Sequence, residues 1–258
     1  MIECGCFGLK KQKKNKCMMR IGVLCIDYNY SPIPGDVDCN DTFEYDMIYE
    51  KIRGLTFERA QQGYWDECIE LNVKIALRRL ETSGCIGITG DCGFMMAYQI
   101  RIRRLTTLPV FMSSLLQAPI VEAMFQKEER IMIVTANEHS LTTNLNHLLT
   151  KCGIGVQDTN RFVVVGCESL PSFQTITTGN ATINYKSLSK ELNEHIFHKL
   201  TMFPNVKCIL LECTELPAYS DLIRKRTHLP VFDAVTMVNY YFNSMSDNRL
   251  FGIDQWYL

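Results

Sequence analysis

A four-residue sequence, LPVF, occurs twice in this chain of 258 residues, at Leu108–Phe111 and again at Leu229–Phe232. The two copies are 121 residues apart, and a basic segment precedes each of them. Counting back 16 residues from each leucine leads to Cys92 and to Cys213, both directly after an apolar run. Chance can repeat a tetrapeptide, but it does not also align two cysteines. We therefore interpret the pattern as an internal duplication.

The beginnings of the two copies also resemble each other. RIGVLCID at Arg20–Asp27 is similar to RIMIVTAN at Arg130–Asn137, at an offset of 110 residues. The smaller offset means that the first copy carries an insertion of 11 residues. The sequence thus predicts two pseudo-symmetric lobes of related architecture.

Short β-branched runs alternate with helical stretches along both copies. Runs of this kind are typical of a mostly parallel sheet that is covered on both faces. The expected strands are Ile21–Ile26, Cys85–Thr89, Pro109–Met112, Ile131–Thr135, Phe162–Val165, Cys208–Leu211 and Pro230–Phe232. The expected helices are Tyr64–Leu80, Phe94–Arg104, Glu138–Leu149, Ser187–Leu200 and Ala218–Arg226. The fold class is therefore α/β, with the active site in the cleft between the lobes.

We expect four regions in the chain. Residues 1–18 carry five lysines without an amphipathic period and are expected to be a flexible basic tail. Residues 19–117 form the first lobe and residues 118–217 the second lobe. Residues 218–258 are expected to pack back on the first lobe.

Composition excludes several classes of protein. The net charge is −1, and the tail alone contributes +4, which leaves −5 on the rest and disfavours nucleic-acid binding. No apolar run approaches the ~20 residues of a membrane-spanning helix. The twelve cysteines are diluted over a long chain, and no secretory signal precedes them. We therefore expect reduced thiols and a cytoplasmic location.

Cys92 and Cys213 are the candidate catalytic residues. Each follows the carboxyl end of a strand and precedes a helix, the position where functional side chains of open α/β sheets gather. The helix dipole is expected to lower the pKa of a thiol there, to well below ~8.5 if the pair is catalytic. Two acid/base groups on opposite faces of one carbon are the minimum needed to invert a stereocentre. The other cysteines are interpreted as small buried hydrophobic residues.

Five further residues are candidates for substrate binding. Gly93 leaves backbone amides free beside Cys92, and the Thr214 hydroxyl lies next to Cys213. Asp27 and Thr135 end pseudo-equivalent strands, and Ser113 follows the strand of the first LPVF copy; a helix-capping role is equally open for these three. Glu215 either orients a thiol or raises the pKa of the Cys213 thiol, and we assign it no role. No metal site is expected, because His195 and His198 lack a third ligand, and no nucleotide-binding loop appears.

Two motifs carry a resemblance to a known family. At GDCGF and LLECTELP the chain resembles the aspartate/glutamate/hydantoin racemase superfamily, whose members use paired cysteines without pyridoxal phosphate. Cys213-Thr214-Glu215 is similar to the Cys-Thr-Glu of aspartate racemases. SSLLQ and IPGD are similar to a little-characterised branch described only as aspartate/glutamate racemase family. The resemblance covers about residues 19–250 and implies two catalytic thiols, no cofactor and a homodimer. The motifs lie at Gly90–Phe94, Leu210–Pro217, Ser113–Gln117 and Ile33–Asp36.

Together these observations lead to a cofactor-independent racemase of an acidic amino acid, aspartate or glutamate, acting on a small carboxylate-bearing substrate with Cys92 and Cys213 as the acid/base pair. Gly93 and Phe94 replace the Asn-Thr that usually follows the first cysteine in such racemases. The alternatives are therefore a related carbanion enzyme of the hydantoin racemase, maleate isomerase or arylmalonate decarboxylase type. A non-catalytic amino-acid-binding protein of the same fold is a third alternative.

Overall fold

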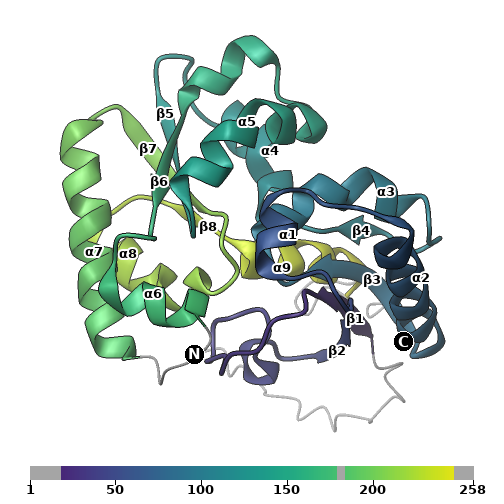
Figure 1. Ribbon diagram of the computed structural model, residues 1–258. Coiled ribbons are helices and arrows are strands. Elements are labelled where there is room, and N and C mark those ends of the chain that lie inside the picture. Colours follow the sequence, from purple (N-terminus) through teal and green to yellow (C-terminus); the bar gives the residue numbers. More distant parts are fainter. Residues whose placement is uncertain (1–18, 179–183, 247–258) are drawn as a thin grey trace, which may run out of the picture.

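The computed structural model describes residues 19–178 and 184–246, so the expected tail at residues 1–18 and the end of the segment 218–258 lie outside the described residues. Two four-stranded sheets, parallel throughout, form two lobes that lie side by side (Figure 1). The predicted α/β fold with two lobes is confirmed. No helix in the described ranges is both long and apolar enough to cross a membrane.

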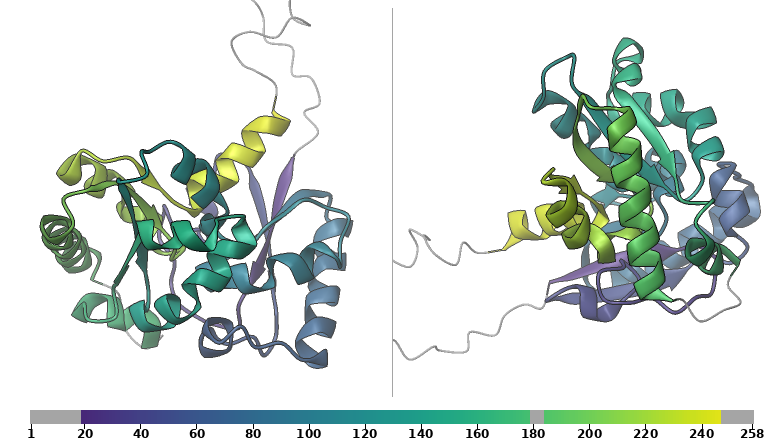
Figure 2. Two further views of the ribbon diagram at one scale, coloured as in Figure 1. Left: turned by 90° about the horizontal axis from the view of Figure 1, so that it is seen from above. Right: turned by 90° about the vertical axis from the view of Figure 1, so that its left-hand side faces the viewer.

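The first sheet is held between helices. Its strand order is β2-β1-β3-β4. One face packs against α2 (Glu67–Thr82) and the other against α9 (Ala234–Met245). Figure 2 shows α9 in yellow beside the purple β1. The strands are β1 (Arg20–Cys25), β2 (Asp46–Lys51), β3 (Cys85–Gly90) and β4 (Val110–Phe111).

The second sheet is built in the same way, with strand order β6-β5-β7-β8. One face packs on α5 (Glu138–Cys152), and α7 (Tyr185–Met202) lies on the other. The strands are β5 (Arg130–Thr135), β6 (Phe162–Gly166), β7 (Val206–Leu211) and β8 (Val231–Phe232). The C-terminal part of the chain thus serves both lobes, because β8 pairs with β7 while α9 contacts the first lobe. The lobe boundaries expected at residues 117 and 217 stay a prediction.

The pairing register of the strands shows the same duplication as the sequence. The pairing of β1 with β3 shifts between Arg20 and Ile21, and that of β5 with β7 shifts between Arg130 and Ile131. Both shifts fall at the position where the two RI sequences align. Since strand order and register shift are both repeated, the two lobes are copies of one arrangement.

The shorter elements connect the sheets at their edges. Both segments after the cysteines, expected as single α-helices, begin as 3₁₀ helices and continue as α-helices. They are Gly93–Tyr98 with α3 (Gln99–Arg103), and Leu216–Tyr219 with α8 (Ser220–Thr227). The remaining helices are α1 (Phe57–Gln61), α4 (Ala118–Ala123), α6 (Pro171–Thr178) and the 3₁₀ turns Asn40–Thr42, Ser114–Gln117 and Val156–Arg161.

Helix starts follow capping rules that the sequence carries. Asp66, Asn137, Asn184 and Asp233 each accept a backbone N–H in the first turn of α2, α5, α7 and α9. At Asp233 the side chain of Thr236 completes a capping box. Polar side chains therefore set where these helices begin.

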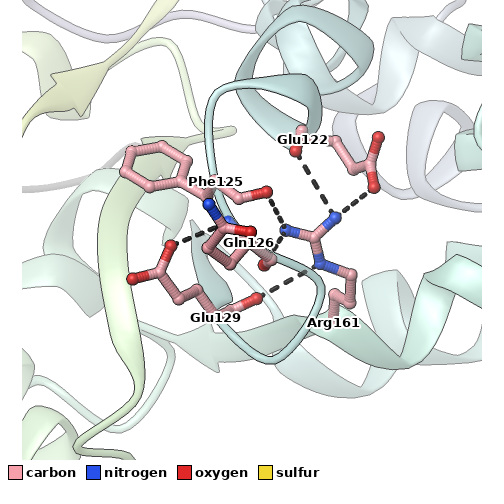
Figure 3. A network of polar contacts seen from close by, with 5 residues as sticks. All are labelled: Glu122, Phe125, Gln126, Glu129 and Arg161. Carbon is pink, nitrogen blue, oxygen red and sulfur yellow. Dashed lines mark hydrogen bonds and ion pairs between the residues drawn. The ribbon is translucent and has the colours of Figure 1, made fainter.

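A buried arginine holds the turn between α4 and β5. The Arg161 side chain is 7% exposed and donates to the backbone carbonyls of Glu122, Phe125, Gln126 and Glu129, which surround the turn between α4 and β5 (Figure 3). It also pairs with the Glu122 carboxylate. Because one guanidinium satisfies four carbonyls and a carboxylate, removing it leaves several partly buried acceptors without this donor.

Replacing this arginine tests its structural role. We expect Arg161→Leu to lower the free energy of unfolding by about 3 kcal/mol, measured by urea denaturation. Arg79→Leu is the matched control, since Arg79 pairs with Glu50 on the surface and its loss should cost under ~1 kcal/mol. Equal losses in the two variants would contradict this assignment.

Candidate functional site

Both thiols line one small cavity where the two lobes meet. Cys92 follows β3 and Cys213 follows β7, and both side chains are buried in the wall of this cavity. Parallel strands present their carboxyl ends at one edge, and the two sheets turn these edges toward each other. The cavity is therefore the candidate active site.

The backbone after the two cysteines is similar. The N–H of the residue two positions later lies near each thiol and favours its charged form, Phe94 beside Cys92 and Glu215 beside Cys213. A 3₁₀ helix begins at Gly93, directly after Cys92, and another begins at Leu216, three residues after Cys213. The duplicated backbone thus gives both thiols the same cradle.

The side chains at these pseudo-equivalent positions differ. The Cys213 thiol donates a hydrogen bond to Oε2 of Glu215, whereas Cys92 has the phenyl ring of Phe94 in the corresponding place. A carboxylate beside a thiol can accept its proton, and a phenyl ring cannot. The two thiols are therefore chemically unequal.

A second carboxyl group, Glu212, lines the cavity near both thiols. The Thr135 hydroxyl donates to its Oε2 at 2.8 Å, while its Oε1 is buried without a partner. A Cβ at Gly93 would lie 2.2 Å from the Glu212 carbonyl oxygen and 2.3 Å from its Oε1, so only glycine fits there. Glycine at position 93 thus makes room for the Glu212 side chain.

The opposite wall of the cavity is aromatic and acidic. Tyr28, Tyr30 and Phe57 line it together with Asp38. The Tyr30 hydroxyl donates to Asp36 at 2.6 Å and lies 3.3 Å from Asp38. No lysine, arginine or histidine stands among the lining residues in the part of the chain that the structure describes. Such a lining favours a cation over an anion.

Burial controls the ionisation of the carboxyl groups. It raises the pKa of Glu212 to about 8, that of Glu215 to about 7 and that of Asp38 to about 6. Burial also raises the pKa of Asp91, with the Asp38 charge as the next cause. Near neutral pH, Glu212 is therefore largely protonated and Glu215 is close to half-ionised.

The expected lowering of the thiol pKa values is wrong. Burial, followed by the Glu212 charge, raises the pKa of Cys92 well above its ordinary value. Burial and the Glu215 charge do the same to the pKa of Cys213. Desolvation and neighbouring carboxylates outweigh the short helix termini, so both groups are protonated thiols.

The residues predicted for substrate binding divide into two sets. Gly93 and Thr214 line the cavity, although the Thr214 hydroxyl is already donated to the carbonyl oxygen of Asp91. Asp27, Ser113 and Thr135 are not in its lining. Asp27 is exposed and accepts the N–H of Gly54, Ser113 caps a 3₁₀ turn, and Thr135 acts on the cavity only through Glu212.

Sequence reasoning missed most of the polar and aromatic lining. Asp91 and Glu212 directly precede the two cysteines at the 121-residue offset, so the repeat already contained the signal for them. Tyr28 and Tyr30 follow the carboxyl end of β1, which was a second signal. Nothing local indicates Asp38 or Phe57, because long connections bring them to the cavity.

One group of side chains in residues 19–178 and 184–246 has the spacing of metal ligands. The ligand atoms of Cys25, Asp38 and Asp91 lie within 4.8 Å of one another. Both Asp91 oxygens already accept the N–H of Ile26 at 3.0 Å, and the Cys25 thiol donates weakly to Asp38. These hydrogen bonds account for the cluster, and we assign no metal to it.

Comparison with curated proteins identifies the relatives of this chain. It is 41% identical over 243 residues to dimethylsulfoniopropionate lyase 3 of Emiliania huxleyi, covering 92% of this chain and 63% of that protein. It is 37% identical over 242 residues to lyase 7 of the same organism, at 92% and 70% coverage. It is 34% identical over 238 residues to the dimethylsulfoniopropionate lyase of Durusdinium sp. clade D, at 92% and 78% coverage. The chain belongs to the dimethylsulfoniopropionate lyase family.

Solved structures similar to this lyase-family chain show where the fold occurs. The allantoin racemase of Klebsiella pneumoniae matches with a TM-score of 0.61 at 13% identity, covering 88% of this chain and 87% of that one. An aspartate racemase homologue of Pyrococcus horikoshii matches with a TM-score of 0.55 at 15% identity, covering 88% and 99%. No family model matches the chain. The resemblance to the racemase superfamily is thus confirmed for the fold.

The predicted function is corrected by the lyase relatives. An isomerase that racemises aspartate or glutamate in amino-acid metabolism is contradicted, because relatives at 34–41% identity over nine tenths of the chain are lyases. The motifs behind that prediction specify the shared scaffold and its two thiols, and a scaffold does not determine the reaction. The carboxyl-rich cavity is also unsuited to a dicarboxylate.

The buried glutamate predicts a pH dependence of stability. The pKa of Glu212 rises from 4.5 to about 8 on folding, so the folded chain keeps a proton that the unfolded chain releases. The free energy of unfolding should therefore fall as pH rises from about 5 to about 8, by up to ~1.4 kcal/mol per pH unit for this group. Glu212→Gln should flatten this fall in urea titrations, and the exposed control Glu128→Gln should not. An unchanged slope in Glu212→Gln would contradict the burial of a protonated carboxyl.

Proposed function

We propose that this chain cleaves dimethylsulfoniopropionate by β-elimination to acrylate and dimethyl sulfide. Membership of the lyase family supports dimethylsulfoniopropionate as the substrate. The hydrogen bond between Cys213 and Glu215 supports the reaction, because it pairs a thiol with a proton acceptor. The chain spans 63% of the length of the E. huxleyi lyases 3 and 6, so the activity is assigned here to the part of the fold that holds the cavity.

The reaction needs one strong base. A base removes a proton from the carbon next to the carboxylate, and that C–H electron pair becomes the carbon–carbon double bond. The bond between the next carbon and sulfur then breaks, and its electron pair stays on sulfur. Dimethyl sulfide leaves as a neutral molecule that needs no proton. The reaction therefore needs only one of the two thiols as a base. Two unequal thiols suit it better than two equivalent thiols that exchange roles.

Cys213 is the proposed base, and Glu215 is its proton acceptor. The Cys213 thiol is protonated because burial and the Glu215 charge raise its pKa. A sulfonium cation bound within ~4–6 Å favours the charged form of an acid, by 1–3 pKa units in typical cases. A cation that binds nearer to the sulfur than to the Glu215 carboxylate favours the thiolate more than the carboxylate, so it promotes transfer of the Cys213 proton to Glu215. An anionic ligand has the opposite effect.

Glu212 is the proposed partner of the substrate carboxylate. Its Oε2 accepts from Thr135, so its proton resides on Oε1, which is buried and lacks a partner in the described structure. A protonated carboxyl can donate a charge-assisted hydrogen bond to a carboxylate. That bond gains strength as negative charge moves onto the substrate carboxylate during proton removal. Dimethylsulfoniopropionate is thus the small carboxylate-bearing substrate that we propose in place of an acidic amino acid.

The mechanism also favours a reducing location. A thiolate base is inactive once it is oxidised. The cytoplasmic environment expected from the cysteine usage would keep Cys213 reduced, and we retain it as part of the proposal.

Serine substitutions test the assignment of the base. We expect Cys213→Ser to lower the release of dimethyl sulfide, measured by gas chromatography, at least ~100-fold, because a serine hydroxyl is a far weaker acid than a thiol. Cys92→Ser should cost ~10-fold or less, since it keeps a small hydrogen-bonding group in the wall. The exposed Cys68→Ser is the control. Absence of dimethyl sulfide with the reduced wild-type chain would refute the function, and equal loss in both variants would refute the single base.

The proton acceptor predicts the pH profile. Because burial raises the pKa of Glu215 to about 7, kcat/KM should rise with pH through about 7 as this carboxyl ionises. Glu215→Gln should lower kcat/KM ~100-fold and remove that limb of the profile. A limb that persists at the same pH in Glu215→Gln would assign it to another group.

A further inference from the structure

We propose that the rings of Tyr28, Tyr30 and Phe57 form a subsite for a fully alkylated onium group, which selects methylated cations over neutral groups of the same shape. The inference deepens the proposed function and rests on it for the identity of the natural ligand. It assigns to these rings the recognition of the sulfonium end of the substrate.

The three rings form one continuous wall. The centroids of Tyr28 and Tyr30 are 5.3 Å apart in a stacked arrangement, and those of Tyr28 and Phe57 are 6.1 Å apart. All three line the cavity that also contains Cys92 and Cys213. A cation at this wall therefore shares a cavity with the proposed base.

The wall is held in place from both lobes. Phe57, the first residue of α1, packs against an apolar cluster that spans both lobes and against the core of the second lobe. Tyr28 packs against the spanning cluster and Tyr30 against the core of the second lobe. Hydrogen bonds from Tyr30 to Asp36 and Asp38 fix the position of its ring. The rings are thus set before a ligand binds, which lowers the entropic cost of binding.

One polar atom of the wall lacks a partner. The Tyr28 hydroxyl is buried and makes no hydrogen bond in the described structure. Buried hydroxyls are ordinarily satisfied, so an unsatisfied one at a cavity indicates a ligand contact. Methyl groups on a cationic sulfur or nitrogen carry positively polarised C–H bonds, and the Tyr28 oxygen can accept from them.

The chemistry of the lining selects the kind of cation. A primary ammonium group finds carboxylates to which it can donate, but a dimethylsulfonium group has no N–H or O–H to donate. Its charge is spread over methyl groups, which bind best to aromatic faces. Asp38 and Glu215 line the same cavity and supply the negative field. The aromatic rings contact the methyl groups of the ligand, and the carboxyl groups attract its positive charge. Together they form a site suited to an onium group.

Binding of two unreactive probes tests this subsite. The probes are 3-(trimethylammonio)propionate, whose cationic head is a poor leaving group, and 4,4-dimethylpentanoate, its isostere with an uncharged tert-butyl head; both carry the same carboxylate. Calorimetry with the full-length wild-type chain should show at least ~10-fold tighter binding of the cation. Tyr28→Leu and Phe57→Leu should each reduce this ratio to ~3-fold or less, while Tyr28→Phe should keep most of it because the ring remains. Tyr240→Leu is the matched control, since Tyr240 is 72% exposed.

The outcomes separate the subsite from the lyase function. A ring-dependent preference for the cation supports the subsite, even if the chain releases no dimethyl sulfide and the proposed function fails. Equal binding of both probes by the wild-type chain overturns it. An unchanged ratio in folded Tyr28→Leu or Phe57→Leu also overturns it, even if dimethyl sulfide is released. Circular dichroism checks folding, and if one leucine variant unfolds, the other decides.

Discussion

The site depends on direct contact between the two strand ends that carry the thiols. Gly93 lies against Glu212, and the Thr214 hydroxyl donates to the carbonyl oxygen of Asp91. These contacts join the turn after β3 to the turn after β7, so both thiols reach one cavity. A side chain at position 93 would force the turns apart. The cavity is therefore a property of the interface between the lobes.

The duplication provides a symmetric scaffold, and a few side chains make the site asymmetric. Strand order, register shift and the cradle around each sulfur are repeated in both lobes. The pair Phe94 and Glu215 breaks this symmetry and gives only Cys213 a carboxylate partner. A racemase needs two groups that exchange roles, whereas an elimination needs one base. The same fold can thus serve either reaction by a change beside one thiol.

Sequence patterns predicted the parts of the structure that depend on local signals. The apolar strands of both sheets and the position of both thiols followed from hydrophobic runs and from the 121-residue repeat. The edge strand β2 was not predicted, because polar and apolar residues do not alternate regularly along it. The predicted lowering of the thiol pKa values was wrong, because these values depend on burial and on carboxyl groups that come from distant parts of the sequence. The predicted amino-acid substrate was wrong, because the motifs around the thiols are shared by proteins of this fold and do not specify the side chains of the cavity wall.

In the proposed mechanism, a bound cation creates the thiolate base. Ultraviolet difference spectroscopy measures it directly, because a thiolate absorbs where a thiol does not. Adding 3-(trimethylammonio)propionate to the reduced chain near neutral pH should produce the absorbance of about one thiolate per chain, which Cys213→Ser should lack. The isostere with an uncharged tert-butyl head should produce none. No thiolate signal with the trimethylammonio ligand, or an equal signal with both ligands, would show that the cationic head does not create the base.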